Sequence, residues 1–261
     1  MMGVTHATSG AAAWIAVTGT MPLLVTELHP LDPVAVIVGS FVCSGAALLP
    51  DADHHSATIS HSVPVLGRLA TGVVGSVSGG HRHGAHSLVG AVIVGFVAWA
   101  LTLLTLTTDH LGTFSIGTAL GAAALVCFAV KARAVVRSWS AAWMLGGIVG
   151  LAVVLLAPGS VEWFPVAVVL GFLAHLVGDL LTTGGLPGLL WPIKPRPPRR
   201  LRRTPVLNRI WLPNGYIAVP LLGNAGSIRE AVLGIVLAAY VFAGLGYESF
   251  RAFGVDVTAL F

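Results

Sequence analysis

Histidine and aspartate side chains gather in three short segments that lie far apart in this chain. The segments are Leu48–His54, Gly80–Leu88 and Gly171–Thr182, and each borders a long apolar run. In a chain that is 56% hydrophobic and only 9% charged, ionisable groups beside apolar runs are costly and usually mark a functional site. The three segments therefore predict a metal centre at one face of a membrane protein.

His175 and Asp179 are four positions apart in a predicted helix. They lie about 40° apart around its axis and share one face. One helix can thus offer an imidazole nitrogen and a carboxylate oxygen to a single ion. The alternative is a hydrogen-bonded pair that joins neighbouring helices.

Asp51, Asp53 and His54 follow Pro50, which should end the preceding helix. Two carboxylates one residue apart can reach two different ions, or one of them can bridge two ions. The alternative is a solvated turn in which an aspartate caps the next helix.

His81 and His86 flank a short segment that contains Arg82. On a continuous helix the two imidazoles would diverge by about 140°, but glycines before and within the segment predict a loop that folds back. Such a loop directs both histidines to one place and sets Arg82 beside the metal as a clamp for phosphate or another oxyanion. A histidine-rich loop without a ligand is the alternative. Three further histidines are expected to be accessory or solvated: His55, His61 and His83.

The predicted ligand set offers only nitrogen and oxygen atoms: His6, Asp51, Asp53, His54, His81, His86, His175 and Asp179. This set exceeds the three protein ligands and one water of a catalytic zinc, so we expect two or three divalent ions. Zinc is the first choice, and manganese and iron are also compatible with these ligands. Metal ions of this kind activate a bound water and polarise the bond under attack. Asp53 is expected to bridge two ions or orient that water, and Arg82 to stabilise developing negative charge.

Long apolar runs must position these residues. Several approach the ~20 residues that cross a hydrocarbon core of about 30 Å. They lie at Thr8–Leu28, Val34–Pro50, Ser87–Thr107, Gly112–Val130, Trp139–Ala157, Trp163–Thr183 and Arg229–Tyr247. With a mean hydropathy of +0.89, the chain is predicted to be all-α: a polytopic membrane helical bundle of about seven transmembrane helices, forming one domain over residues 1–261. No Lys or Arg precedes the first run, so it is expected to be a retained helix rather than a signal peptide.

Basic residues divide unequally between the two faces that these spans define. Of the 14 Lys and Arg residues, only Arg251 falls on the face opposite the N-terminus. The positive-inside rule places the basic face in the cytoplasm. His6 and the three histidine-aspartate segments all fall at this face, and their convergence predicts one shared site there.

Residues 193–210 form a basic loop rich in proline and arginine on the same face. It is expected to fix the topology and to attract anionic lipid, at about 1 kcal/mol per basic residue. The alternative is that some of its arginines gather an anionic headgroup into the site. No nucleic-acid partner is expected. Ser227 and Glu230 have the spacing of a capping box at the start of the last span, which favours a structural role for Glu230.

At these residues the chain resembles the YdjM-like family of bacterial inner membrane-associated, metal-dependent hydrolases, formerly a domain of unknown function. The matching motifs are T-H at Thr5–His6, L-L-P-D-x-D-H at Leu48–His54, G-H-R-x-x-x-H-S-L at Gly80–Leu88, H-x-x-x-D-x-L-T at His175–Thr182, G-L-P-G-L-L-W-P at Gly185–Pro192 and G-S-x-x-E at Gly226–Glu230. The chain departs from the family pattern at His83 and Ala85, where Gly and Thr are usual. The family is also distantly similar to the helical zinc-dependent phospholipase C and P1-type nuclease enzymes, which hydrolyse phosphoesters with clustered histidine and aspartate.

The resemblance implies a hydrolase of the inner cell membrane with its active site facing the cytoplasm. A site at the bilayer edge favours a phosphoester of a lipid or other amphipathic molecule as substrate. Two other classes stay open. A metal-binding sensor or scaffold without turnover would have similar ligands, whereas a metal-ion transporter is less favoured because its ligands should lie near the midplane. The sequence leaves the oligomeric state open.

Overall fold

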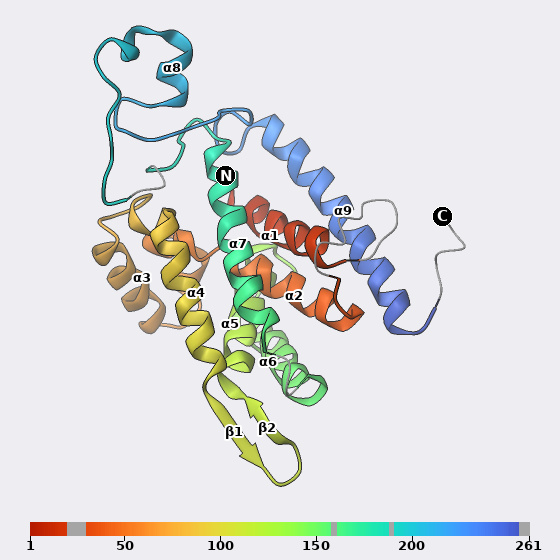
Figure 1. Ribbon diagram of the computed structural model, residues 1–261. Coiled ribbons are helices and arrows are strands. Elements are labelled where there is room, and N and C mark those ends of the chain that lie inside the picture. Colours follow the sequence, from red (N-terminus) through yellow and green to blue (C-terminus); the bar gives the residue numbers. More distant parts are fainter. Residues whose placement is uncertain (20–29, 158–160, 188–190, 256–261) are drawn as a thin grey trace.

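A computed structural model describes residues 1–19, 30–157, 161–187 and 191–255. Most of this part of the chain is helical (Figure 1). The helices are α1 Gly3–Thr18, α2 Pro33–Ala46, α3 Leu66–Val77, α4 Leu88–Thr102, α5 Ile116–Ala132, α6 Trp139–Leu156, α7 Trp163–Leu180, α8 Pro205–Ile210 and α9 Ile228–Ala252. Two antiparallel strands, β1 Thr105–Thr108 and β2 Gly112–Ser115, form a hairpin between α4 and α5.

Serine residues mark the starts of four helices. The hydroxyls of Ser87, Ser115, Ser138 and Ser227 each accept a hydrogen bond from the backbone N–H three residues later, at the beginnings of α4, α5, α6 and α9. Each bond satisfies a donor that the first turn of a helix leaves free. The polar residues that interrupt the apolar sequence therefore set where these helices begin.

Helix α2 lies at the centre of the bundle, against α1, α5, α7 and α9. Its neighbours approach it closely because glycines stand at the contacts. A Cβ atom at Gly45 would lie 1.9 Å from the carbonyl oxygen of Leu125 on α5. A Cβ at Gly171 on α7 would lie 2.3 Å from the carbonyl oxygen of Cys43. Small residues at such contacts let backbones pack directly against one another, as is common between membrane helices.

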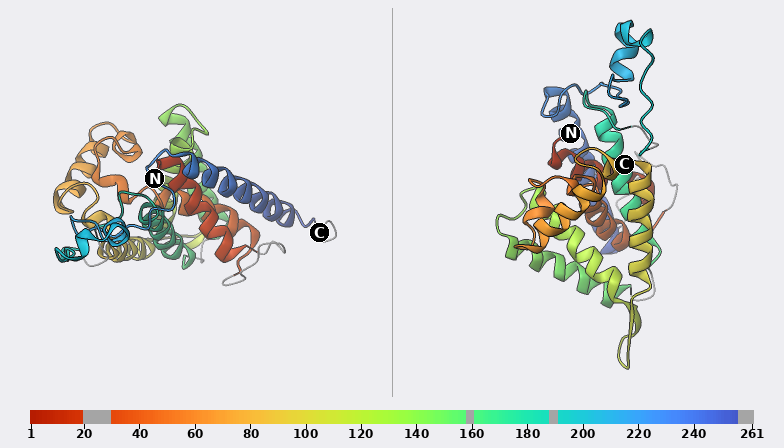
Figure 2. Two further views of the ribbon diagram at one scale, coloured as in Figure 1. Left: turned by 90° about the horizontal axis from the view of Figure 1, so that it is seen from above. Right: turned by 90° about the vertical axis from the view of Figure 1, so that its left-hand side faces the viewer.

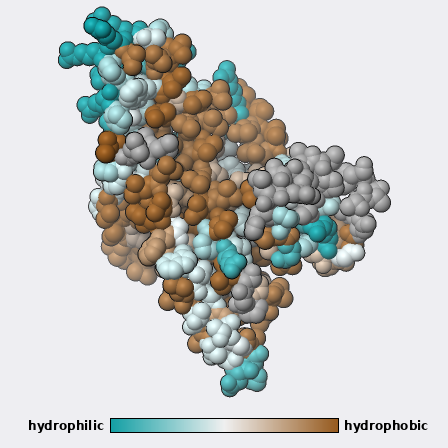
Figure 3. Space-filling model, viewed as in Figure 1, coloured by the Kyte–Doolittle hydropathy of each residue, from teal (hydrophilic) through white to brown (hydrophobic). Residues whose placement is uncertain are grey.

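Within the described residues, four helical segments are long and apolar enough to cross a membrane: Pro33–Asp53, α6, α7 and α9. Exposed apolar side chains cover much of the surface between the polar α8 segment at one end and the hairpin at the other (Figure 3). The right-hand view of Figure 2 shows the same opposition of α8 and the hairpin. Since a soluble protein rarely exposes an apolar surface of this extent, this apolar surface faces lipid.

The prediction of about seven spans is confirmed only in its coarser form, a mostly helical membrane protein. Helices α4 and α5 are apolar but shorter than a full span. The expectation of an all-α chain was wrong at the hairpin, because the predicted runs Ser87–Thr107 and Gly112–Val130 continue beyond the helices into strands. Threonine-rich segments such as Thr105–Thr108 favour strand over helix because the branched side chain packs well on a pleated surface.

Two further boundaries differ from the sequence prediction. Helix α1 begins at Gly3, ahead of the expected start at Thr8, and the end of that predicted run lies outside the described residues. The segment expected to be a loop between the second and third spans contains helix α3. Within the basic loop, residues 193–210, the chain forms a 3-10 turn, η4 Leu201–Arg203, and the short helix α8.

Candidate metal centre

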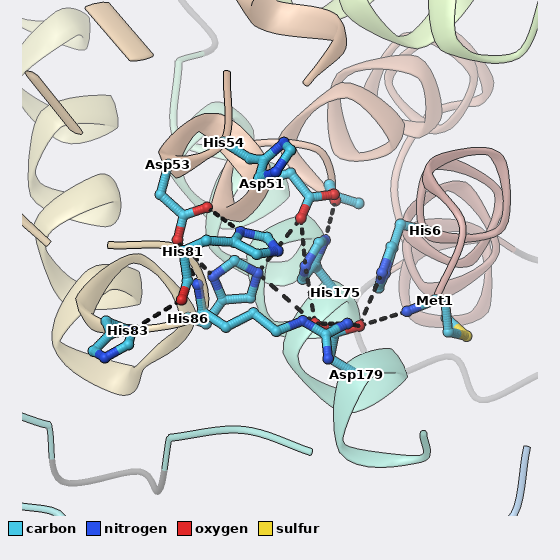
Figure 4. A network of polar contacts seen from close by, with 12 residues as sticks. Met1, His6, Asp51, Asp53, His54, His81, His83, His86, His175 and Asp179 are labelled. Carbon is cyan, nitrogen blue, oxygen red and sulfur yellow. Dashed lines mark hydrogen bonds and ion pairs between the residues drawn. The ribbon is translucent and has the colours of Figure 1, made fainter. Parts of the chain in front are cut away.

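Histidine and aspartate side chains from four separate elements converge at one end of the bundle (Figure 4). Helix α1 brings His6, and helix α7 brings His175 and Asp179. Two 3-10 helices, η1 Pro50–Asp53 and η3 Gly84–His86, supply Asp51, Asp53 and His86, and His81 lies in the turn before η3. Three overlapping groups have ligand atoms close enough to share an ion: His6 with His175 and Asp179; Asp51 with His86 and His175; and Asp53 with His81 and His86.

The imidazole of His175 is held in one orientation by the end of α2. Its Nδ1 donates a hydrogen bond of 2.8 Å to the carbonyl oxygen of Ala47. Because a carbonyl can only accept, the proton is on Nδ1 and the lone pair is on Nε2. That Nε2 atom is buried and has no hydrogen-bond partner. A histidine that ligates a metal usually donates its other ring nitrogen to a backbone carbonyl in this way.

Asp53 orients the imidazoles of His81 and His86, which belong to one loop (the histidine loop, residues 80–86). Its Oδ2 lies 3.1 Å from Nδ1 of His86 and accepts a 2.9 Å hydrogen bond from the backbone N–H of Arg82. Its Oδ1 lies 2.7 Å from Nδ1 of His81. The Asp53 side chain is fully buried. Both carboxylate oxygens are therefore engaged in holding the loop, and Nε2 of His86, also buried, is left without a hydrogen-bond partner.

Four atoms surround a common space between these elements. Nε2 of His86 lies 3.5 Å from Oδ1 of Asp51 and 3.8 Å from Oδ2 of Asp179. Nε2 of His175 lies 3.8 Å from each of the same two oxygens. A zinc ion with bonds of about 2.0–2.2 Å in tetrahedral geometry would place its ligands about 3.3–3.6 Å apart. The observed separations are close to these values, and the ligand atoms of Asp51, His86 and His175 lie close enough to one another to share one ion.

Asp179 joins this group to the N-terminal helix. Its Oδ1 lies 2.5 Å from the Met1 amino nitrogen and 3.3 Å from Nε2 of His6, and it accepts a 3.2 Å hydrogen bond from Arg82. The rings of His6 and His175 stack with centroids 3.6 Å apart. Nδ1 of His6 is buried and also lacks a hydrogen-bond partner. A second ion can thus use His6 with Asp179, beside the first.

The structure brings together seven of the eight predicted ligands, and His54 is the exception. Its ring lies 4.7 Å from that of His81, but its Nδ1 lies 2.6 Å from the hydroxyl oxygen of Ser56. Among the histidines expected to be accessory, His83 has its Nδ1 atom 2.8 Å from the carbonyl oxygen of His81. Glu230 caps backbone groups at Met2 and Gly226, in line with the structural role expected for it.

Arg82 lies at the rim of the site with its side chain about one quarter exposed. Its backbone adopts a positive φ of 57°, and its carbonyl oxygen accepts a 3.0 Å hydrogen bond from the hydroxyl of Tyr216. Neither Tyr216 nor the Ala47 carbonyl was among the predicted site residues. No local pattern marks either of them, because each contact joins residues more than a hundred positions apart.

Metal binding is expected to release a proton from His86. Burial lowers the pKa of this imidazole, but its contacts with Asp51 and Asp53 outweigh burial and raise the pKa to about 9. A metal at Nε2 must displace that proton, so apparent affinity should rise about tenfold per pH unit from pH 6 and level off near pH 9. Competition with a zinc-binding dye at pH 6, 7 and 8 measures this slope. An affinity that stays constant across that range would contradict the assignment of His86 as a ligand.

A buried histidine-aspartate centre at one end of a bundle of apolar helices defines a helical membrane protein with a candidate metal site. The family model described as YdjM inner membrane protein matches residues 1–250, and the chain belongs to this family. No curated protein and no solved structure matches the chain.

Proposed function

We propose that this protein is a membrane-embedded, metal-dependent hydrolase that cleaves a phosphoester of a lipid or other amphipathic substrate. The proposal depends on one observation: two buried imidazole nitrogens without hydrogen-bond partners, Nε2 of His86 and Nε2 of His175, lie within 3.8 Å of carboxylate oxygens of Asp51 and Asp179. Unpaired buried polar atoms are costly and rare, and a bound cation would satisfy both nitrogens. When bound there, a divalent ion supplies an activated water and a Lewis acid.

The donor set is compatible with zinc first, and with manganese or iron, in two or three positions. Arg82 is suitably placed at the rim to stabilise negative charge on a phosphoryl group, since its planar guanidinium matches phosphate oxygens. We assign Asp53 a positioning role, because both of its oxygens already orient the histidine loop. The distant similarity to phospholipase C and P1-type nucleases is implied by the family resemblance alone, and it serves only as an analogy for the substrate class.

An apolar groove supports an amphipathic substrate. It has a volume of about 480 Å³ and runs between α1, α7 and α9. Its walls include Ala13, Leu173 and Leu237, and one end is formed by Met1 and Gly178, next to Asp179. A hydrocarbon chain in this groove would have its polar end at the metal centre.

Filling the groove should impair turnover of long-chain substrates selectively. Ala13→Leu adds bulk to its wall, so KM for a dioleoyl phospholipid should rise severalfold while a water-soluble phosphodiester is hydrolysed as before. The matched control is Ala239→Leu on α9, which is exposed and outside the groove. Equal effects of Ala13→Leu on both substrates would exclude a chain-binding role for the groove.

The test of function is a turnover assay on purified protein in neutral detergent, with metal removed and then restored. Substrates should include phosphatidate, phosphatidylglycerol and bis(p-nitrophenyl) phosphate. We expect phosphoester cleavage that disappears with chelation and returns with zinc. Stoichiometric metal without turnover on any of them would instead favour a sensor, and metal flux into proteoliposomes would favour a transporter.

We also propose that the centre faces the cytoplasm. The unequal distribution of basic residues supports this orientation. Labelling of a single cysteine introduced in place of Ser56 by a membrane-impermeant reagent tests it: intact spheroplasts should leave the site unlabelled, and inverted membrane vesicles should label it.

A further inference from the structure

A second pocket adjoins the candidate metal centre at Asp53. It encloses about 520 Å³ between the segment after η1, the 3-10 helix η2 Thr58–His61, and helix α3. Its lining residues are Asp53, His55, His61, Arg68, Thr71, Gly72 and Gly75. This volume lies within the range of sites that bind small molecules or headgroups, about 300–1,000 Å³.

The groups available to a ligand in this pocket are hydrogen-bond donors and cations. The acidic member, Asp53, has both carboxylate oxygens engaged with His81, His86 and the backbone of Arg82. The hydroxyl of Thr71 donates to the backbone carbonyl of Gly67. Arg68 and two imidazoles then remain to contact a ligand. A guanidinium with neighbouring imidazoles recognises an oxyanion, and phosphate most readily.

Helix α3 has its pocket residues on one side and an apolar surface on the other. At 100° per residue, Thr71, Gly72 and Gly75 fall within about 60° of Arg68 around the helix axis. Leu69, Val73 and Val77 lie about 100–180° from Arg68 and are 60%, 61% and 75% exposed.

The length of α3 indicates where this apolar surface lies. Its 12 residues extend about 18 Å, too short to cross the bilayer. A short amphipathic helix with an exposed apolar face lies at the boundary between hydrocarbon and headgroups. The pocket beneath α3 is therefore at the depth where lipid phosphates occur.

We propose that this pocket binds the phosphate group of an anionic membrane lipid and holds that lipid beside the metal centre. Arg68 makes the principal contact, with His55 and His61 as further donors. Gly72 and Gly75 leave the wall of α3 without side chains that would fill the space. That the bound lipid is also the substrate rests on the proposed function; the binding itself does not.

The experiment measures lipid binding by the full-length protein after chelation, so that phosphate cannot bind to a metal. Dihexanoyl phosphatidate, inorganic phosphate and dihexanoylglycerol are titrated against the wild type, Arg68→Gln and the double variant His55→Gln/His61→Gln. The matched controls are Arg229→Gln on α9 and His110→Gln in the hairpin turn, both outside the pocket. Metal content and melting temperature are recorded for every variant.

We expect Arg68→Gln to weaken binding of phosphatidate at least tenfold and the double histidine variant to weaken it severalfold, with both controls within twofold of the wild type. Dihexanoylglycerol should bind weakly and independently of Arg68. Unchanged phosphatidate binding in Arg68→Gln, or an equal loss in Arg229→Gln, would overturn the proposal. Inorganic phosphate that binds as tightly as phosphatidate would assign the pocket to free phosphate instead. Arg68-dependent binding in a protein without turnover would refute the proposed function and leave this inference standing.

Discussion

Replacing His175 by alanine is expected to remove at least one metal ion per chain and to lower turnover by about 10³-fold or more. Loss of an outer contact to a metal ligand already costs about 10–100-fold in metal affinity, and His175 offers its unpaired Nε2 directly to two of the three ligand groups. Elemental analysis of the purified variant measures the first effect without any assumption about substrate. A phosphoester assay measures the second.

Two histidine variants and one stability measurement make this result interpretable. His110→Ala, in the hairpin turn, should keep both metal and turnover at wild-type levels. His54→Ala tests the predicted ligand that the structure leaves outside the three groups, and it should also retain its metal. The chelated wild type and chelated His175→Ala should melt at similar temperatures, with zinc stabilising only the wild type. Full metal occupancy in His175→Ala would show that the centre lies elsewhere.

Gly45→Ala is expected to destabilise the fold far more than the addition of one methyl group usually does. The new Cβ would lie 1.9 Å from the carbonyl oxygen of Leu125, so α2 and α5 must separate. Overpacking of this kind costs about 1–3 kcal/mol or more, and the separated helices would also lose contacts around Cys43 and Val126. Thermal unfolding in detergent and the monodisperse fraction on size exclusion both measure the loss.

The chain provides a matched control on α6. Gly147 is also helical, but a Cβ atom there would meet nothing within 4 Å. Gly147→Ala should leave stability unchanged or slightly increased, because alanine loses less backbone entropy in a helix than glycine does. A melting temperature that falls equally in both variants would mean that helix flexibility, rather than close contact, is what these glycines provide.

The sequence predicted which histidine and aspartate side chains gather in the structure, because their chemistry conflicts with their surroundings. Imidazoles and carboxylates such as His175 and Asp179 are conspicuous in apolar runs, and the distribution of charge placed them at one face. The sequence could not predict which ring nitrogen is free. That depends on Asp53 and on the Ala47 carbonyl, whose contacts are formed only by tertiary packing.

The fold was predictable in its apolar helices and less so between them. A window of about 20 residues detects α6, α7 and α9, but it averages over a short helix or hairpin. The apolar positions Leu69, Val73 and Val77 already have helical spacing, so α3 was detectable from its amphipathic pattern. The hairpin was marked more weakly, by threonines and by a glycine at the turn, within runs that were apolar overall.

The residues of the candidate metal centre are far apart along the chain, and this separation determines when the centre can form. Asp179, the most C-terminal of the clustered side chains, is translated after the other six. The two groups that contain His175 cannot form before α7 has been made and has packed into the bundle. If these groups hold metal as proposed, their loading is a late event in biogenesis. Metal supply would then set the active fraction of the protein without limiting how much of it is synthesised.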